Sequence, residues 1–442
     1  MASGWRTGTA NGAQPRAATR GAVLGLEIPP AAAVWIIALG KAAHAMAAGA
    51  VEGLSADGRE VAGGVIVAPE PGAAPHARLR VMVGDHPIPG AQSMAAASAI
   101  AETAASVRDG DHVVVLLSGG GTSLCAAPAL DVPDFSQSDL AALYAALMTS
   151  GADIVAMNAV RKRFARWSGG RLAVALPGAW IHCLVVSDVP GDDVASISAG
   201  PCVGDPVTAP ALVAILERGG LWTRLPDAAR RHLSAVARGD APETPKPHDD
   251  AFSRVAIQVI VSNAHALTAA AGAARAMGID DVTIVETPLT GEASIAGVRL
   301  ASELMARQKL ARGPDTRISR CVIWGVETTV TFATGGAPPA DALGGRNQEL
   351  ALAAARSLAD GGEQVHRIAI LAAGTDGRDG PTDAAGAIVD AMTWRAATES
   401  GRDPAVDLAT HSAYRALDAA AALIRSGHTG TNVMDIVIGL IL

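Results

Sequence analysis

The stretch His112-Val-Val-Val-Leu-Leu-Ser-Gly-Gly-Gly-Thr-Ser123 joins an unbroken apolar run to a turn of three glycines. A continuous apolar run is typical of a strand buried on both faces of a parallel sheet. Glycines leave backbone N–H groups open to an anion, and a following helix N-terminus attracts phosphate. We therefore expect an anion-binding turn at the carboxyl ends of a sheet, where open α/β sheets bind ligands; the alternative is a tight turn that needs glycine only for its backbone angles. Its candidate binding residues are Ser118, Gly119, Gly120, Gly121 and Thr122.

Apolar runs, polar turns and helical segments alternate along the rest of the chain, which predicts an α/β fold with parallel sheets and right-handed crossovers. Strands are expected at 33–39, 63–68, 77–83, 112–117, 180–186, 255–261, 321–324, 328–332, 368–372 and 433–442. Helices are expected from Lys41 to about 53, at 91–105, 139–149 and 154–166, from Asn263 to about 277, and at 348–358.

With 442 residues, the chain is expected to form two domains rather than one core. Residues 239–250 (GDAPETPKPHDD) hold three prolines and no apolar run, which predicts a linker between domains at 1–240 and 251–442. The first 20 residues are interpreted as a mobile extension, and 334–345 as a flexible loop.

Composition excludes several classes of protein. The net charge is −8 without a basic stripe, so no nucleic-acid partner is expected. The four cysteines form no CxxC pair, which argues against a disulfide framework or a zinc site. No apolar run reaches 18 residues and no secretory signal is present, so we expect a cytoplasmic protein that does not enter membranes.

Two cations stand where helices are expected to begin. Lys41 follows a strand directly, and Arg346 precedes the helix at 348–358. A cation is unfavourable at a helix N-terminus, so each indicates a bound anion. A solvated surface position is the alternative for both.

Acidic residues follow the strand at 180–186. Asp188 and Asp192 stand where a carboxylate could hold Mg²⁺ together with phosphate oxygens, or accept a substrate proton. The alternative for Asp192 is a helix N-cap.

Further polar residues are candidates for binding. Asn158 and Arg161 lie three apart and share a helix face, which is either a basic binding patch or a solvated surface. His86 lies in a rigid polar turn, Gly84 to Pro89, where an ordinary loop histidine is the alternative. The remaining candidate binding residues are Glu327, Thr328, Asn347 and Asp376.

Several motifs of known chemistry are missing. The chain has no GxxxxGK[ST] loop, no GxSxG elbow, and no GxGxxG after a strand. Nicotinamide binding therefore has little direct support.

Taken together, these segments resemble the glycerate 2-kinase family, the class II glycerate kinases whose C-terminal part is called the MOFRL domain. The matching pieces run in the family's order: ALGKAAHAMA (38–47), GDHPIPGAQS (84–93), LLSGGGTSL (116–124), NAVRKRFARWSGGRLA (158–173), SDVPGDD (187–193), SAGPCVGDP (198–206), VSNAHAL (261–267), TGEA (290–293), VETTV (326–330), GGRNQELALAAA (344–355), AGTDGRDGPTDAAGA (373–387) and SGHTGTNVMD (426–435).

The resemblance implies ATP-dependent, Mg²⁺-assisted phosphorylation of D-glycerate to 2-phosphoglycerate. It implies a Rossmann-like N-terminal domain, a smaller α/β MOFRL domain, and an active cleft between them. The family's active-site cations fall on Lys41 and Arg346, which we take as catalytic together with Asp188; Asp188 and Asp192 are the metal candidates. We expect Lys41→Ala and Arg346→Ala each to lower turnover at least 10²-fold with normal thermal melting, as expected for charged groups acting on a phosphoryl group.

Four features depart from the family pattern: Val326 replaces a glycine, His428 replaces a proline, the 334–345 loop is longer, and the helical extension before the first strand is shorter. Members of this family are often labelled hydroxypyruvate reductase, so an NAD(P)H-dependent oxidoreductase is the alternative function. A binding protein without turnover is a third reading. The chain is expected to be a monomer or a homodimer.

Overall fold

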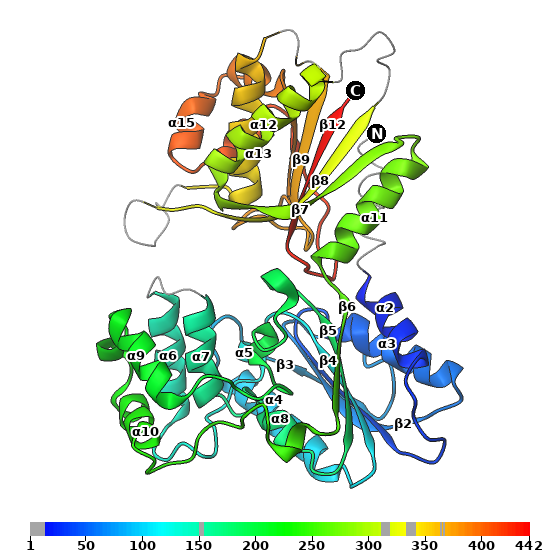
Figure 1. The fold of residues 1–442 in the computed structure, drawn as a ribbon, viewed down its shortest axis with the longest axis vertical. Coiled ribbons are helices and arrows are strands. Elements are labelled where there is room, and N and C mark those ends of the chain that lie inside the picture. Colours follow the sequence, from blue (N-terminus) through cyan, green and yellow to red (C-terminus); the bar gives the residue numbers. More distant parts are fainter. Residues whose placement is uncertain (1–13, 150–153, 311–318, 333–341, 363–364, 366) are drawn as a thin grey trace. The chain divides into compact units, whose positions relative to one another are not determined.

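The computed structural model describes residues 14–149, 154–310, 319–332, 342–362, 365 and 367–442. The chain divides into two compact units, Pro15–Ile260 and a second unit that includes Val261–Leu442. Each contains its own six-stranded sheet (Figure 1).

The sheet of the first unit is built around the apolar strand β4 and has the order β3-β2-β1-β4-β5-β6. The pairs from β3 to β5 are all parallel. This is the strand order of a Rossmann fold, in which the direction of winding reverses between β1 and β4. The strands are β1 Val34–Leu39, β2 Val61–Ala68, β3 Leu79–Val83, β4 His112–Leu117, β5 Trp180–Val186 and β6 Val255–Val261.

Strands β1 and β4 run level with each other. Val34 pairs with His112 at one end and Leu39 with Leu117 at the other. The turns that leave these strands, at Gly40 and at Ser118, therefore begin side by side at the carboxyl edge of the sheet.

Helices cover this sheet and form a second core beside it. Helices α6, α7, α9 and α10 lie next to one another (Figure 1) and share a cluster of buried residues that includes Tyr144, Phe164, Leu212 and Leu233. The helices of the unit are α2 Pro15–Leu24, α3 Ala43–Ala56, α4 Ala91–Ser106, α5 Gly121–Leu124, α6 Gln137–Met148, α7 Ile154–Phe164, α8 Arg171–Val174, α9 Ala209–Arg218 and α10 Asp227–Ala237.

The segment 239–250, predicted as a linker, belongs to the first unit, which extends to Ile260. Glu243 forms an ion pair with the buried Arg163. Thr244 Oγ1 donates to Asp205 Oδ2 at 3.0 Å, and Lys246 Nζ donates to the Val207 carbonyl at 2.9 Å. The proline-rich segment 239–250 is therefore held against the first unit by the buried side chains of Arg163 and Asp205.

The sheet of the second unit has the order β11-β10-β9-β12-β8-β7. Only β7 and β8 pair in parallel, whereas the other four pairs are antiparallel. The expectation of parallel sheets is therefore wrong for this unit, because antiparallel neighbours such as β9 and β10 need no helical crossover. Its strands are β7 Asp281–Glu292, β8 Arg320–Thr329, β9 Ile368–Gly374, β10 Gly386–Asp390, β11 Leu423–Ile424 and β12 Asp435–Ile441.

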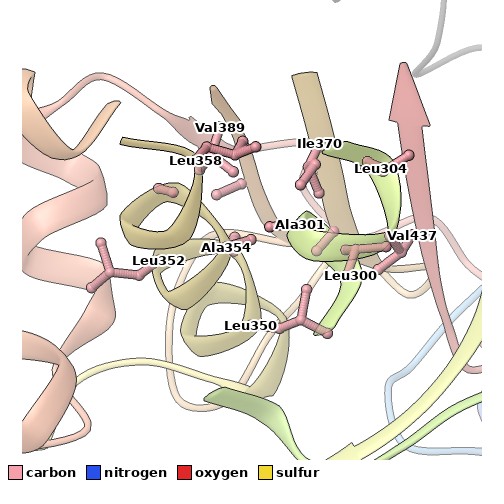
Figure 2. Packing of buried hydrophobic residues seen from close by; sticks show 14 of the residues in the cluster. Leu300, Ala301, Leu304, Leu350, Leu352, Ala354, Leu358, Ile370, Val389 and Val437 are labelled. Atoms are coloured by element: carbon pink, nitrogen blue, oxygen red, sulfur yellow. The ribbon is translucent and has the colours of Figure 1, made fainter. Parts of the chain in front are cut away.

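Helices α12 and α13 pack against strands β9, β10 and β12 to form the core of the second unit. Figure 2 shows leucine and alanine side chains of both helices meeting Ile370, Val389 and Val437, each of which is at most 1% exposed. This packing fixes α13, whose first residue is Arg346. The helices of the unit are α11 Asn263–Ala276, α12 Ala293–Leu310, α13 Arg346–Asp360, α14 Thr393–Glu399, α15 Pro404–Ala409 and α16 Ala413–Ala419.

Two local predictions need correction. The strands expected at 321–324 and 328–332 merge into one strand, β8, which ends at Thr329, so residues 330–332 are not part of a strand. Gly325 lies inside β8, where a Cβ would lie 2.4 Å from Asn263 Oδ1. Residues 15–20 of the expected mobile extension belong to helix α2, which packs against α3 so closely that a Cβ at Gly49 would lie 2.1 Å from the Arg16 carbonyl. Residues 1–13 of that extension, and residues 334–341 of the 334–345 loop, lie outside the described residues.

No described helix combines the length and the apolar character that crossing a membrane requires. All four cysteines are free and buried.

Candidate functional site

Hydrogen bonds join the turns that follow β1 and β4. The backbone N–H of Lys41 donates to the Gly119 carbonyl at 2.9 Å, and the N–H of Ala42 donates to Ser118 Oγ at 3.0 Å. Gly40 has φ +116°, and a Cβ there would lie 2.3 Å from the Ser118 carbonyl oxygen. Only glycine fits this position, so the approach of the two turns depends on it.

The three glycines after β4 serve different purposes. A Cβ at Gly119 would lie 1.7 Å from Asp188 Oδ2, and one at Gly121 would lie 2.3 Å from Ser198 Oγ. Glycine at positions 119 and 121 therefore allows Asp188 and Ser198, which follow β5, to approach the backbone of the turn. Gly120 has φ +86°, in the left-handed region that favours glycine.

The helix that follows this turn, α5, contains only four residues. A single turn aligns few peptide dipoles, so the helix contributes little to anion binding. An anion at this edge would therefore depend mainly on the backbone N–H groups of the glycine turn and on Lys41.

A cavity of about 290 Å³ lies over these turns, within the first unit. It contains seven of the predicted site residues, namely Lys41, Gly119, Gly120, Thr122, Asn158, Arg161 and Asp188. Ser118 and Gly121 lie outside the lining and support the turn from below, since Ser118 accepts hydrogen bonds from Ala42 N–H and, through its carbonyl, from Ser198 Oγ at 2.8 Å. The other lining residues are His86, Pro87, Ser123, Tyr144, Val189, Ser196 and Ser198.

Two cations face this cavity. The Lys41 side chain is exposed and forms no ion pair with any residue that the structure describes. The Arg161 guanidinium stacks on the Tyr144 ring at 5.0 Å and donates weakly to Asn158 Oδ1 at 3.4 Å. The shared helix face predicted for Asn158 and Arg161 is thus part of the cavity wall and not a solvated surface.

Some polar atoms of the wall have no protein partner. Tyr144 Oη and Arg161 Nε are buried and form no hydrogen bond within the described part of the chain. Leaving such atoms unpaired costs about 1–3 kcal/mol each. Burial raises the pKa of Tyr144, so its phenol remains a hydrogen-bond donor at neutral pH.

Arg346, the cation of the second unit, is surrounded by carboxylates. It forms an ion pair with Asp435, which is 5% exposed, while the Arg346 side chain is 49% exposed. Burial opposes the charge of Arg346, but its hydrogen bond to Asp435 and the charges of Asp435, Asp379 and Asp376 raise its pKa. The anion that the sequence analysis expected beside this arginine is, in this structure, a carboxylate of the same unit.

Asp379 anchors the start of α13. Its carboxylate accepts hydrogen bonds from the N–H groups of Asn347 and Gln348 at 3.1 and 2.8 Å. Burial, assisted by the nearby charge of Asp435, raises the pKa of Asp379 to about 7 against the effect of these N–H groups and of Arg346. A Cβ at Gly345 would lie 2.3 Å from this carboxylate, which explains the glycine before the helix.

The other candidates of the second unit differ in exposure. Asn347 is 1% exposed and donates through Nδ2 to Asp379 at 3.2 Å, a supporting position for the helix start. Thr328 is buried, and its Oγ1 has no partner among the described residues, whereas Glu327 is exposed. Asp376 accepts from the Arg378 N–H at 3.0 Å.

Sequence reasoning missed several residues. Asp379 and Asp435 lie inside quoted motifs, but no local pattern assigns them to Arg346. Tyr144 has the spacing of a core aromatic on an amphipathic helix. Ser198 enters the cavity because it adopts φ +51°, which no sequence signal indicated.

The donor set for a divalent metal is small. No group of three or more His, Cys, Asp or Glu side chains gathers within the described ranges. Asp188 is the carboxylate in the cavity lining, and Mg²⁺ bound with phosphates commonly uses one or two carboxylates. Asp188 is therefore the described carboxylate of this cavity that could contribute to a magnesium site, whereas Asp192 is not part of the lining.

Comparisons with known proteins agree on one family. A family model described as a domain of unknown function (DUF4147) matches residues 9–234, and the MOFRL family matches residues 320–435. A Pyrococcus horikoshii protein named glycerate 2-kinase is 36% identical over 419 residues, covering 95% of this chain and 90% of the relative. An Agrobacterium vitis relative, 36% identical and covering 91% of this chain and 85% of its own, carries the provisional name hydroxypyruvate reductase.

A solved structure extends this agreement to the fold. The crystal structure of glycerate kinase from Thermotoga maritima superposes with a TM-score of 0.83 at 32% identity, covering 99% of this chain and 98% of that chain. The chain therefore belongs to the glycerate kinase family that carries a C-terminal MOFRL domain.

Proposed function

We propose that this protein transfers the terminal phosphate of ATP to the 2-hydroxyl of D-glycerate, giving 2-phosphoglycerate. The observation that carries the proposal is the cavity at the β1/β4 switch point, where Lys41 and the glycine turn face Asp188. Membership in the glycerate kinase family supports the choice of substrate.

Phosphoryl transfer asks the protein mainly for positioning and for charge neutralisation. Lys41 supplies a point charge to a phosphate oxygen, and the backbone N–H groups of the glycine turn donate hydrogen bonds to the same phosphate, with no glycine side chain in the way. Arg161 and the Tyr144 hydroxyl, which has no hydrogen-bond partner among the described residues, offer donors to a second anionic group, such as a carboxylate.

Asp188 would hold Mg²⁺, which neutralises phosphate charge when it is bound with the nucleotide. Its carboxylate reaches the turn because position 119 is glycine. Asp192 remains a weaker metal candidate, because it does not line the cavity.

Arg346 is proposed to contribute the guanidinium donors that Asp435 does not use. Its half-exposed side chain and the anchoring of α13 by Asp379 support this role. A planar guanidinium binds a carboxylate or phosphate through two parallel hydrogen bonds, which suits it to orient an anion.

We further propose a cytoplasmic enzyme, because four free, buried thiols fit a reducing compartment. The monomer or homodimer expected from the sequence stays a prediction.

The test compares two reactions of the purified protein. With D-glycerate, ATP and Mg²⁺, we expect ADP release and a product that enolase consumes directly. With hydroxypyruvate and NADH or NADPH, we expect no oxidation of the nicotinamide, which would be measured as a loss of absorbance at 340 nm. Nicotinamide oxidation without ADP release would replace the kinase by the reductase, and binding of both ligands without turnover would replace it by a binding protein.

A further inference from the structure

His86 is the one histidine among the described residues that line the cavity of the first unit. It lies in the loop between β3 and α4, and the function proposed above leaves it without a role. A Cβ at Gly120 would lie 3.6 Å from both Cδ2 and Nε2 of His86 and 3.5 Å from Lys41 Cγ. The imidazole edge and the lysine stem therefore border the same open space above the glycine turn.

The loop that carries His86 is anchored on both sides. A Cβ at Gly84 would lie 2.0 Å from the Leu124 carbonyl, so this backbone lies directly on the end of α5. Asp85 and Ser93 bond reciprocally, since Asp85 N–H donates to Ser93 Oγ and Ser93 N–H donates to Asp85 Oδ2, both at 3.0 Å. A ring held in this way is positioned before any ligand arrives.

Burial and the neighbouring positive charges favour the neutral form of the His86 ring. Burial lowers the pKa of His86, and the positive charges of Lys41 and Arg161 lower it further. Asp188 is the described carboxylate that lines the same cavity. A neutral imidazole can accept a proton at physiological pH, which neither cation of the cavity can do.

Among the described side chains that line the cavity, Asp188 and His86 are the two candidate proton acceptors, because the others are cationic, hydroxyl, amide or apolar groups. Asp188 fits the metal, as argued above. His86 is then free for the proton that the substrate hydroxyl must lose.

We propose that His86 is a catalytic residue whose Nε2 accepts the proton of the substrate's 2-hydroxyl during phosphoryl transfer. This inference rests on the proposed function. The bond from the 2-oxygen to the terminal phosphorus forms, and the bond from that phosphorus to the bridging oxygen breaks with its electron pair leaving on the diphosphate. The hydroxyl proton moves to His86 and then to water.

The test uses His86→Gln, His86→Ala and the matched control His248→Gln, an exposed histidine of the same unit outside the cavity lining. General-base catalysis contributes about 10²–10⁴-fold, so we expect His86→Gln to lower kcat at least 10²-fold. Dissociation constants for D-glycerate and MgATP by calorimetry, and the melting temperature, should stay close to wild type. The control should match wild type in every measurement.

The pH profile and chemical rescue separate a base from a structural part. Wild-type kcat should fall on acidification below the usual histidine range, and this limb should be missing from His86→Gln. Added imidazole should restore His86→Ala at least about tenfold, since it supplies the missing base. An unchanged acid limb, or a loss of kcat that imidazole does not restore, overturns the assignment.

The failure of this inference differs from the failure of the proposed function. If the wild-type protein forms 2-phosphoglycerate and His86→Gln forms it equally fast, only the assignment of His86 as general base is overturned. A wild-type protein that forms no 2-phosphoglycerate overturns the proposed function and this role with it.

Discussion

Lys41 and Arg346, the two cations expected to act together, have opposite surroundings. Lys41 lies at the cavity of the first unit and pairs with no carboxylate in the described parts of the chain. Arg346 of the second unit pairs with buried Asp435, and Asp379 and Asp376 also act on its charge. The difference indicates that the lysine charge is available to an external anion, whereas the arginine charge also stabilises its own fold.

The largest expected effect comes from removing each cation. We expect Lys41→Met and Arg346→Ala each to lower kcat/KM at least 10²-fold, because one contact near 4 Å at an effective dielectric of about 20 is worth about 4 kcal/mol before desolvation. The two variants should differ in melting temperature. Lys41→Met should melt at the wild-type temperature, since the Lys41 side chain is exposed. In Arg346→Ala the buried Asp435 is left without its partner, so the free energy of unfolding should fall by about 1–3 kcal/mol and the melting temperature with it.

This outcome revises the expectation of normal melting for both variants. Calorimetry of the two proteins together with Arg346→Lys, which keeps the charge, provides the check. Equal melting of Lys41→Met and Arg346→Ala would remove the difference between the two sites.

An intermediate effect is expected from a single methyl group in the glycine turn. Gly119→Ala places a Cβ 1.7 Å from Asp188 Oδ2, so the turn or the carboxylate must move. Such crowding costs about 1–3 kcal/mol, and we expect turnover to fall at least tenfold with it.

The matched control is Gly21→Ala in helix α2, where nothing lies within 4 Å of the new Cβ. Because alanine is the better helix former, this variant should keep its activity and gain up to about 1 kcal/mol. Steady-state kinetics and urea unfolding measure both changes. A fully active Gly119→Ala protein would show that Asp188 need not approach this turn.

The smallest effects concern pH, and the two units should respond in opposite directions. In the first unit, burial and then the neighbouring His112 lower the pKa of His182 to about 4, so its contribution to stability is present above about 6.5 and is lost as the pH falls toward 4. In the second unit the raised pKa of Asp379, about 7, means that stability is lost as the pH rises from about 4 to 7.

These contributions offset each other in the wild-type protein, so variants are needed to separate them. The melting temperature of His182→Gln, compared with wild type at the same pH, should rise as the pH falls toward 4. That of Asp379→Asn, compared in the same way, should rise as the pH increases toward 8. Melting curves at half-unit pH steps provide the measurement. Parallel curves for wild type and a variant would show that its residue does not titrate in this window.

Much of the first unit could be predicted because its central strands, such as β1 and β4, are buried on both faces. Strand β5 was predicted at its observed bounds, 180–186, and β4 likewise at 112–117. The glycine turn and Lys41 could be found because each follows such a strand directly. In the second unit the apolar runs indicated strands, but the direction in which neighbours pair is not written in a run of apolar residues.

The sequence by itself determined the family, the glycine turn at the switch point and seven of the residues that line the cavity, since these depend on residue type and on the order of neighbouring residues in the chain. Only the tertiary structure decided that 239–250 is held by Arg163, that Asp435 pairs with Arg346, and that His86 and Tyr144 face the same space as Lys41. Such contacts join residues far apart in the chain. Their partners are chosen by the packing of whole elements, which no local pattern encodes.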